Sequence, residues 1–191
     1  MPTTQLRQGI PLIATGFLLT FWSSPGQTFF ISLFGDELRA VLNLNHAQFG
    51  ALYSTATLLS AVILLWSGTL IDRYPLPTII AAVVAMLSTS LLLLSAAKTI
   101  AVAFIALLLL RHLGQGLMML IASSSIVRYL DKLRGRGNAL SGMGYACAEA
   151  ALPVTVIWLT TQYGWQLALQ FSAIILLLAI LPVLMLLLRG H

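Results

Sequence analysis

The chain has 191 residues, of which 59% are hydrophobic and 8% are charged, and its mean hydropathy is +0.97. Because an average soluble domain carries about 25% charged residues, this composition excludes a soluble enzyme and a disordered chain. The ten basic residues outnumber five acidic ones, but they are divided among short connectors and form no basic stripe, which excludes a nucleic-acid-binding protein.

Six apolar stretches are each long enough to cross a bilayer, which takes about 20 helical residues. Their ranges are 10–34, 46–71, 77–95, 99–127, 137–161 and 165–188. A helix satisfies its own backbone hydrogen bonds in lipid, and the continuous apolar runs contradict the alternation of a membrane β-strand. We therefore predict an all-α fold, in which residues 1–191 form one six-helix transmembrane domain in the lipid bilayer.

Four of these spans carry polar side chains at helical spacing, whereas 77–95 and 165–188 are uniformly apolar and suit a lipid-facing role. Such spacing collects side chains on one face of a helix. The polar residues are Thr20, Ser24 and Gln27 in the first span, Tyr53, Thr57 and Ser60 in the second, Arg111 and Gln115 in the fourth, and Asn138, Gly142, Tyr145 and Glu149 in the fifth. Helix packing also explains hydroxyls and glycines, so the functional argument depends on the charged residues.

The basic residues predict the orientation of the bundle. Six crossings place both chain ends on one side. That side carries seven basic residues, which are Arg7, Arg73, Arg128, Lys132, Arg134, Arg136 and Arg189. The other side carries Arg39 and Lys98. Because cytoplasmic loops are enriched in basic residues, we expect both termini to be cytoplasmic in a plasma or inner cell membrane.

Arg111 and Glu149 lie near the middle of the membrane. Arg111 is 13 residues from Lys98 and 17 from Arg128, and Glu149 is 13 from Arg136; each residue advances a helix by about 1.5 Å. A central arginine costs roughly 2.5–3.5 kcal/mol on insertion scales, so both charges must face protein, water or each other. Two interpretations stay open: an ion pair that only joins spans four and five, or a solute or proton site in a water-filled cavity.

Pro153 favours the second interpretation, because it cannot donate to the carbonyl of Glu149, which is then free for water or a ligand. Arg111 suits a small anionic solute such as a carboxylate, unless Glu149 neutralises it. The Glu149 carboxyl equally suits a proton. His112 points about 100° away from Arg111, and packing explains it better than a functional role.

Two short patterns resemble signatures of the major facilitator superfamily. The turn Gly68-Thr69-Leu70-Ile71-Asp72-Arg73 is similar to the family's Gly-x-Leu-x-Asp-Arg loop between helices 2 and 3. The segment Arg111-His-Leu-Gly-Gln115-Gly116 is similar to its Arg-x-x-x-Gln-Gly signature in helix 4. The resemblance covers all 191 residues as the family's N-terminal six-helix half. It differs after Arg73, where the family has a glycine and basic residues and this chain has prolines.

The resemblance implies a secondary active transporter that moves a small solute by alternating access, with helices 1, 2, 4 and 5 around a central cavity. Glu149 and Pro153 stand where family antiporters have a Gly-Pro pattern, which argues against a drug antiporter. We expect a solute or proton site formed by Arg111, Glu149, Gln115, Gln27, Tyr53 and Tyr145. We expect a conformational latch formed by Gly68, Asp72 and Arg73.

Family members usually have two such halves, so the open side of this chain requires an explanation. The chain is incomplete, pairs with a separate six-helix half, or forms a homodimer, and we expect the first. A non-transporting scaffold or regulator is the alternative function. The sequence has no Gly-x-Ser-Gly tetrad, no phosphate-binding loop and no His/Cys cluster, so we expect no enzyme activity, no cofactor and no metal.

Overall fold

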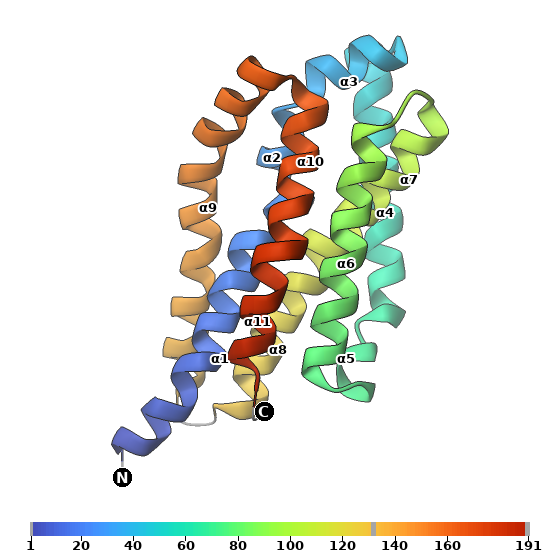
Figure 1. Cartoon of the computed structure of the whole chain (residues 1–191). Helices are drawn as coiled ribbons and strands as arrows, with labels where there is room; N and C mark the ends of the chain where they lie inside the picture. The colour runs from blue at the N-terminus through green and yellow to red at the C-terminus, as the bar shows by residue number, and fades with distance from the viewer. Residues whose placement is uncertain (1, 131–132, 190–191) are drawn as a thin grey trace.

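Every regular element is a helix in residues 2–130 and 133–189, which are the residues that the computed structural model describes, with side chains from residue 9 onward. Lys132 and the Arg7 side chain, both used above for orientation, lie outside this description. The helices form an elongated bundle, and the first turns of α1 lie at the same end as the last turns of α11 (Figure 1). The two ends of the described chain therefore share one side of the bundle.

Five stretches are long and apolar enough to cross a membrane: His46–Arg73, Leu76–Ser95, Ile100–Tyr129, Arg134–Tyr163 and Trp165–Leu187. The first contains α4 (His46–Ser67) and α5 (Leu70–Arg73), and the second is α6 (Leu76–Ser95). The third contains α7 (Ile100–Leu110), the π-helix η2 (Arg111–Met118) and α8 (Met119–Tyr129). The fourth is α9 (Arg134–Tyr163), and the fifth contains α10 (Trp165–Ile175), the π-helix η4 (Leu176–Ile180) and α11 (Leu181–Leu187). The prediction of an all-α membrane protein is confirmed over these residues.

The first expected span, 10–34, is not one continuous helix. It is divided into α1 (Pro2–Trp22), a 3-10 turn η1 (Ser24–Gly26) and α2 (Thr28–Ser32). Pro25 has no backbone N–H, and the Ser23 hydroxyl donates back to the Thr20 carbonyl at 2.8 Å. The backbone N–H groups of Gly26 and Gln27 bond to the carbonyls three residues earlier, at 3.0 and 2.8 Å, in place of the α-helical ladder. Gln27 then continues in an extended conformation, with φ −87° and ψ 153°. The sequence prediction missed this break.

The ends of several helices follow from local sequence signals. Asn45 and Gln48 form a capping box at the start of α4, with hydrogen bonds of 2.8 and 2.9 Å, which satisfies two free N–H groups. Thr99 caps α7 through the Val102 N–H. In the last span, Pro182 lies in the first turn of α11 and cannot donate to the carbonyl four residues earlier. The wide π turn η4 directly precedes α11.

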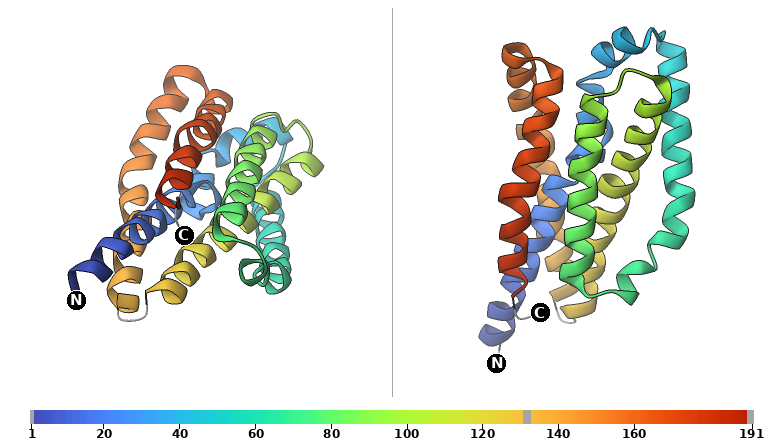
Figure 2. Two further views of the ribbon diagram at one scale, coloured as in Figure 1. Left: turned by 60° about the horizontal axis from the view of Figure 1, so that its bottom comes forward. Right: turned by 45° about the vertical axis from the view of Figure 1, so that its right-hand side comes forward.

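Helix α6 packs between α10 and α7, and α1 runs along α9 (Figure 2). In the apolar window of α6, 56% of the residues are buried, compared with 11% for α4. The fully buried side of α6 includes Ile80, Val84, Leu87 and Leu91. The lipid-facing role expected for the whole of α6 is therefore limited to a narrow stripe that contains Met86. α10, η4 and α11 expose a broader apolar surface, as expected.

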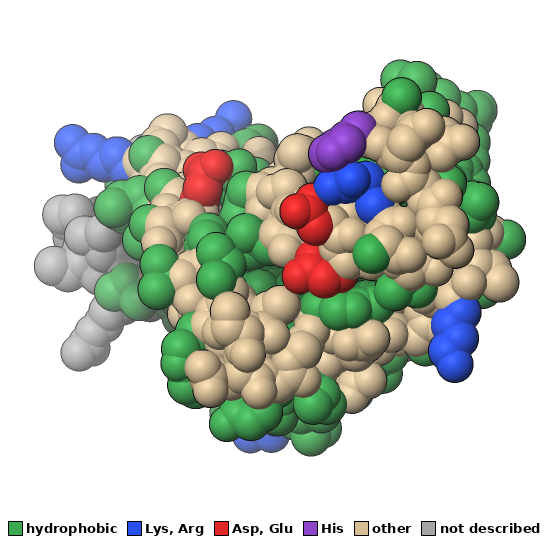
Figure 3. Space-filling view, turned by 90° about the horizontal axis from the view of Figure 1, so that it is seen from above, with side chains coloured by type: hydrophobic (Ala, Val, Ile, Leu, Met, Phe, Trp, Pro, Cys, Tyr) green, Lys and Arg blue, Asp and Glu red, His purple; other side chains and the backbone are tan. Residues whose placement is uncertain are grey.

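The short helix α3 (Gly35–Leu42) covers one end of the bundle. Its first turn holds Asp36 and Glu37, which suit the positive end of the helix dipole, and Arg39 forms an ion pair with Asp36. Seen from this end, acidic, basic and histidine side chains gather in one area, while much of the remaining surface is hydrophobic (Figure 3). Charged side chains therefore gather beside α3 at this end of the bundle.

Candidate functional site

Arg111, the first residue of η2 in the fourth expected span, is enclosed by groups from the first and second expected spans. Only 5% of this residue is exposed. Its Nε donates to the Thr57 hydroxyl at 3.1 Å, and its Nη1 donates to the Gly26 carbonyl at 2.9 Å and the Thr28 hydroxyl at 3.4 Å. The guanidinium carbon lies 5.2 Å from the centre of the Tyr53 ring, which is within the range of a cation–π contact. All of these partners are electrically neutral.

The break in the first span makes this arrangement possible. Gly26 belongs to η1, where its carbonyl faces the guanidinium instead of serving a continuous helix. Gly26 packs directly on Gly114 of η2: a Cβ added to Gly114 would lie 2.8 Å from the Gly26 Cα. Two facing glycines therefore allow the backbone of the broken span to reach the helix that carries Arg111.

Arg111 and Gln115, four residues apart on η2, differ in their exposure. Arg111 is buried, whereas Gln115, expected on the same face one turn later, is exposed. Contacts with Gly26 of η1 and Thr57 of α4 cover Arg111. His112 is buried, and its Nδ1 lies 3.3 Å from the Ser60 carbonyl oxygen. This contact fastens η2 to α4.

Two hydroxyl groups form the outer edge of the Arg111 site. The oxygens of Thr28 and Tyr53 are 2.9 Å apart and share a hydrogen bond. Thr28 is exposed and Tyr53 is half-buried, so this pair lies between the buried guanidinium and the surface. The prediction that Tyr53 lies near Arg111 agrees with this arrangement.

Glu149 and Tyr145 form a separate polar group on α9. Glu149 is exposed, and the half-buried Tyr145 precedes it by four residues, about one turn of α9. The Tyr145 ring packs edge-on against Phe29 of α2, with the ring centres 5.9 Å apart. Arg111 and Glu149, both within the described part of the chain, form no ion pair. The open interpretation of a fixed bridge between these two residues is therefore wrong for this structure.

Gln27 lies inside the bundle rather than at an open face. It is 6% exposed, and its Nε2 donates to the Ser23 hydroxyl at 3.3 Å. That hydroxyl also lies 3.4 Å from the sulfur of Met119. The Gln27 amide therefore bonds within the broken first span, and the structure does not bring it to the Arg111 guanidinium.

Sequence reasoning left three partners of the guanidinium out of the candidate site, which are Gly26, Thr28 and Thr57. The sequence did contain a signal for Gly26 and Thr28. Pro25-Gly26 interrupts an apolar span, and a broken membrane helix presents backbone carbonyls to polar groups inside the bundle. Thr57 was on the polar face of the second span, but its spacing alone did not distinguish a ligand of Arg111 from a packing residue.

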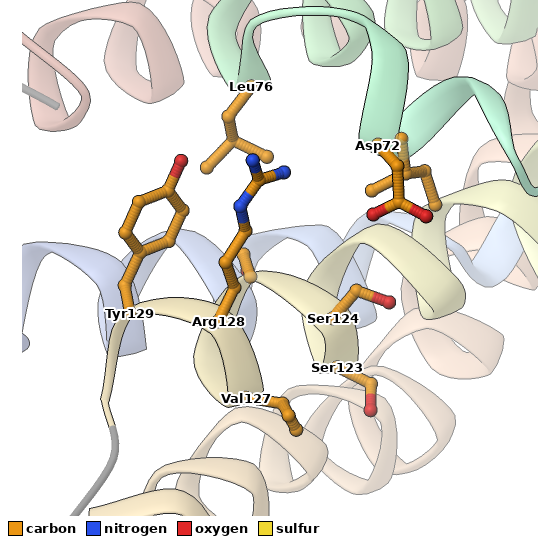
Figure 4. Close-up of a pocket in the computed structure, with 9 residues that line it drawn as sticks. Asp72, Leu76, Ser123, Ser124, Val127, Arg128 and Tyr129 are labelled. Carbon is orange, nitrogen blue, oxygen red and sulfur yellow. The ribbon is translucent and has the colours of Figure 1, made fainter.

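A second feature is a cavity of about 420 Å³ at the end of the bundle that carries α5. Asp72 of α5 and Arg128 of α8 both extend into it (Figure 4). Its lining residues are Ile71, Asp72, Leu76, Ser123, Ser124, Ser125, Val127, Arg128 and Tyr129. Of the expected latch residues, Asp72 lines this cavity, while Gly68 packs against α8, where an added Cβ would lie 3.1 Å from a Leu120 methyl group. Arg73 is exposed and is not among the lining residues.

The comparison with known families agrees with this architecture. The family model described as Major Facilitator Superfamily matches residues 16–191, a range that includes both signature segments and every spanning helix above. No curated protein and no solved structure matches the chain. Members of the matched family are membrane transporters rather than enzymes. The match covers most of the chain and confirms the resemblance found in the sequence: this protein belongs to the Major Facilitator Superfamily.

Proposed function

We propose that this chain is a secondary active transporter, or one half of one, that moves a small solute by alternating access. The single observation that supports this most is the state of Arg111. It is a buried cation in a membrane-spanning helix, and its hydrogen-bond partners are neutral. An ionisable group at this depth commonly marks a solute or ion pathway.

A purely structural role explains this arrangement less well. A guanidinium that only held helices together would be better compensated by a carboxylate, since an unpaired buried charge is destabilising. Instead, Arg111 joins the broken first span to α4 through Gly26 and Thr57. Binding or release of a charged group at Arg111 would therefore act on three spans together, which is what a transporter requires of its central site.

Glu149 supports the expectation of a partner on the open side. Its carboxylate is exposed on a spanning helix, and exposure to hydrocarbon is costly for a carboxylate. We propose that this face borders a water-filled cavity closed by a second six-helix half or a second copy of the chain. Gln115, Tyr145 and Glu149 then belong to the wall of that cavity, and Glu149 is the candidate for proton coupling.

The cavity beside Asp72 is the candidate latch. Asp72 and Arg128 have opposite charges and extend from α5 and α8 into the same space. α8 continues the helix that carries Arg111, so movement at the central site would be transmitted along one span to this cavity. We place this end of the bundle, with both chain termini, on the cytoplasmic side, in keeping with the excess of basic residues there.

The test is transport by the purified chain in sealed liposomes. Solute uptake from a mixed panel of labelled small metabolites, together with an internal pH dye, is measured under imposed pH and voltage gradients. We expect flux that Arg111→Gln abolishes and that Arg189→Gln, which removes an exposed charge at the chain end, leaves unchanged. A chain that gives no flux under any gradient, or an Arg111→Gln variant with undiminished flux, would favour the scaffold alternative.

A further inference from the structure

We propose that Arg111 binds a carboxylate group through Nη2, the one nitrogen of its guanidinium that the described chain leaves without an acceptor. This inference rests on the proposed function and names the solute chemistry of its central site. Three observations support it: Nη2 has unpaired N–H donors, Nη2 is accessible, and the charge of Arg111 has no compensating carboxylate in the described chain.

The hydrogen bonds of Arg111 are incomplete. A guanidinium has five N–H donors. Nε donates to Thr57, and Nη1 donates to Gly26 and to Thr28. Within residues 2–130 and 133–189, no acceptor lies within hydrogen-bond distance of Nη2. Two charged donors thus have no protein partner in a residue that is 95% buried, since only 5% of it is exposed.

Nη2 is not sealed inside the protein. The described side-chain atoms that are both fully enclosed and unpaired are the hydroxyl oxygens of Thr15, Ser67 and Thr160. Nη2 is not one of them, so the small exposed part of Arg111 is available to a ligand. Thr28, which is itself exposed, lies beside this opening.

The neighbouring hydroxyls provide one more donor. The Thr28 oxygen accepts from Arg111 Nη1 and shares a second hydrogen bond with the Tyr53 hydroxyl. Two hydroxyl groups have two protons, and their mutual bond uses one of them. The other proton remains able to donate outward. The edge of the site therefore presents the two Nη2 N–H groups and a hydroxyl O–H, and none of the described residues that contact the guanidinium is acidic.

The charge balance favours an anion with at least two oxygens. A buried cation needs a compensating charge, and Glu149 does not supply one within this chain. A carboxylate can accept from an Nη2 N–H through one oxygen and from the free hydroxyl O–H at the edge of the site through the other, which a spherical ion cannot do. The carboxylate could come from a free solute or from Glu149 of a second copy, and these two sources share the same chemistry at Nη2.

Binding can be tested with the full chain in lipid nanodiscs. The melting temperature is followed by tryptophan fluorescence while acetate, lactate or succinate is added at constant ionic strength, with acetamide as the neutral control. A ligand that binds only the folded state raises the melting temperature in a saturable way. We expect this rise with at least one carboxylate and not with acetamide. We expect Arg111→Gln to abolish it, Arg111→Lys to weaken binding about ten-fold or more, and Arg189→Gln to leave it unchanged.

A second pair of variants protects the test against misfolding of the Arg111 variants. Thr28→Val removes an exposed hydroxyl from the edge of the site and should weaken carboxylate binding several-fold. Thr55→Val removes an exposed hydroxyl of α4 that bonds only within its own helix, to the Ala51 carbonyl, and should have no effect. Equal binding by the two variants would overturn the role of Thr28 and with it the proposed site.

Glu149→Gln distinguishes the two sources of the carboxylate. If a free solute is the ligand, the wild-type chain binds it and Glu149→Gln changes little. If Glu149 of a second copy occupies the site, free carboxylates bind tightly only to Glu149→Gln. The absence of a saturable carboxylate effect in both proteins would overturn the inference. Carboxylate binding without flux would support the carboxylate site and contradict transport by this chain alone. Flux of neutral solutes that is unchanged by added carboxylates and by Arg111→Lys would overturn the carboxylate site and support transport.

Discussion

The Arg111 guanidinium donates a hydrogen bond to the Gly26 backbone carbonyl at 2.9 Å, across 85 positions of the chain. This bond joins two interruptions of regular structure. Gly26 lies in the 3-10 turn that breaks the first span, and Arg111 begins the π-helical part of the fourth. Both helices are thus irregular at the point where they meet. Irregular backbone inside a membrane protein is tolerated where it is buried in protein or borders a cavity.

The close contact between Gly26 and Gly114 is the first feature to test. Gly114→Ala should lower the free energy of unfolding by about 1–3 kcal/mol, as expected for overpacking. The reason is that the new Cβ would lie 2.8 Å from backbone atoms of Gly26 that cannot move independently. The measurement is thermal unfolding in nanodiscs. Gly142→Ala is the matched control, because a Cβ there meets nothing within 4 Å; equal melting temperatures for the two variants would contradict the prediction.

The hydrogen bond from Arg111 Nε to Thr57 gives the second prediction. Thr57→Val keeps the shape of the side chain and removes the acceptor, which leaves a charged N–H unpaired. A hydrogen bond to a charged group contributes about 1.5–3 kcal/mol, so we expect a loss of stability of that order and a fall in transport. Thr55→Val, on the same helix, should stay near wild type. Wild-type stability and flux in Thr57→Val would show that this bond does not hold the guanidinium.

How much of this site could be predicted from the sequence varies from residue to residue. The interior position of Arg111 follows from its distance to flanking charges, and Tyr53 follows from the polar face of its span. The exposure of Gln115 could not be predicted by counting, because it depends on which neighbouring helices cover that part of η2. Gln27 follows a proline that ends the helix, so its side chain turns into the bundle instead of continuing the polar stripe. Long-range packing decided these positions, and local patterns do not encode it.

The fold, like the site, could be predicted from the sequence only in part. Uniform apolar composition identified the membrane-spanning stretches but did not show how much of each would be buried. α6 was expected to face lipid, yet it lies between α7 and α10. In a membrane, an apolar side chain can face either lipid or another helix, since hydrocarbon and leucine are equally apolar. Hydropathy therefore identifies a spanning helix more readily than it identifies the partners of that helix.

Glu149 provides the third prediction. Glu149→Leu removes a charge from an exposed position on a spanning helix, and exchange of a charged side chain for leucine lowers the cost of inserting that helix. We expect unchanged or higher thermal stability together with the loss of gradient-driven flux in liposomes. Cys147→Leu, which changes another exposed side chain of α9, should keep both properties. A Glu149→Leu protein that still transports solute would remove Glu149 from the coupling mechanism.

The cavity between α5 and α8 gives the last prediction. Asp72 and Arg128 extend into it from different elements, so their attraction should hold α5 close to α8 and restrict entry from this end. A Ser124→Cys probe in a Cys147→Ser background provides a single thiol in the cavity lining. Asp72→Asn should raise its rate of alkylation by a water-soluble maleimide about five-fold, the effect of roughly 1 kcal/mol on a two-state equilibrium. Arg128→Gln should raise the alkylation rate as well. The double variant should exceed neither single variant, because each already removes the same attraction.

Arg73→Gln is the control and should leave the alkylation rate unchanged, since Arg73 is exposed and does not line the cavity. If Arg73→Gln raised the rate and Asp72→Asn did not, the latch would depend on the exposed loop, and the cavity would be a packing feature without a role in opening.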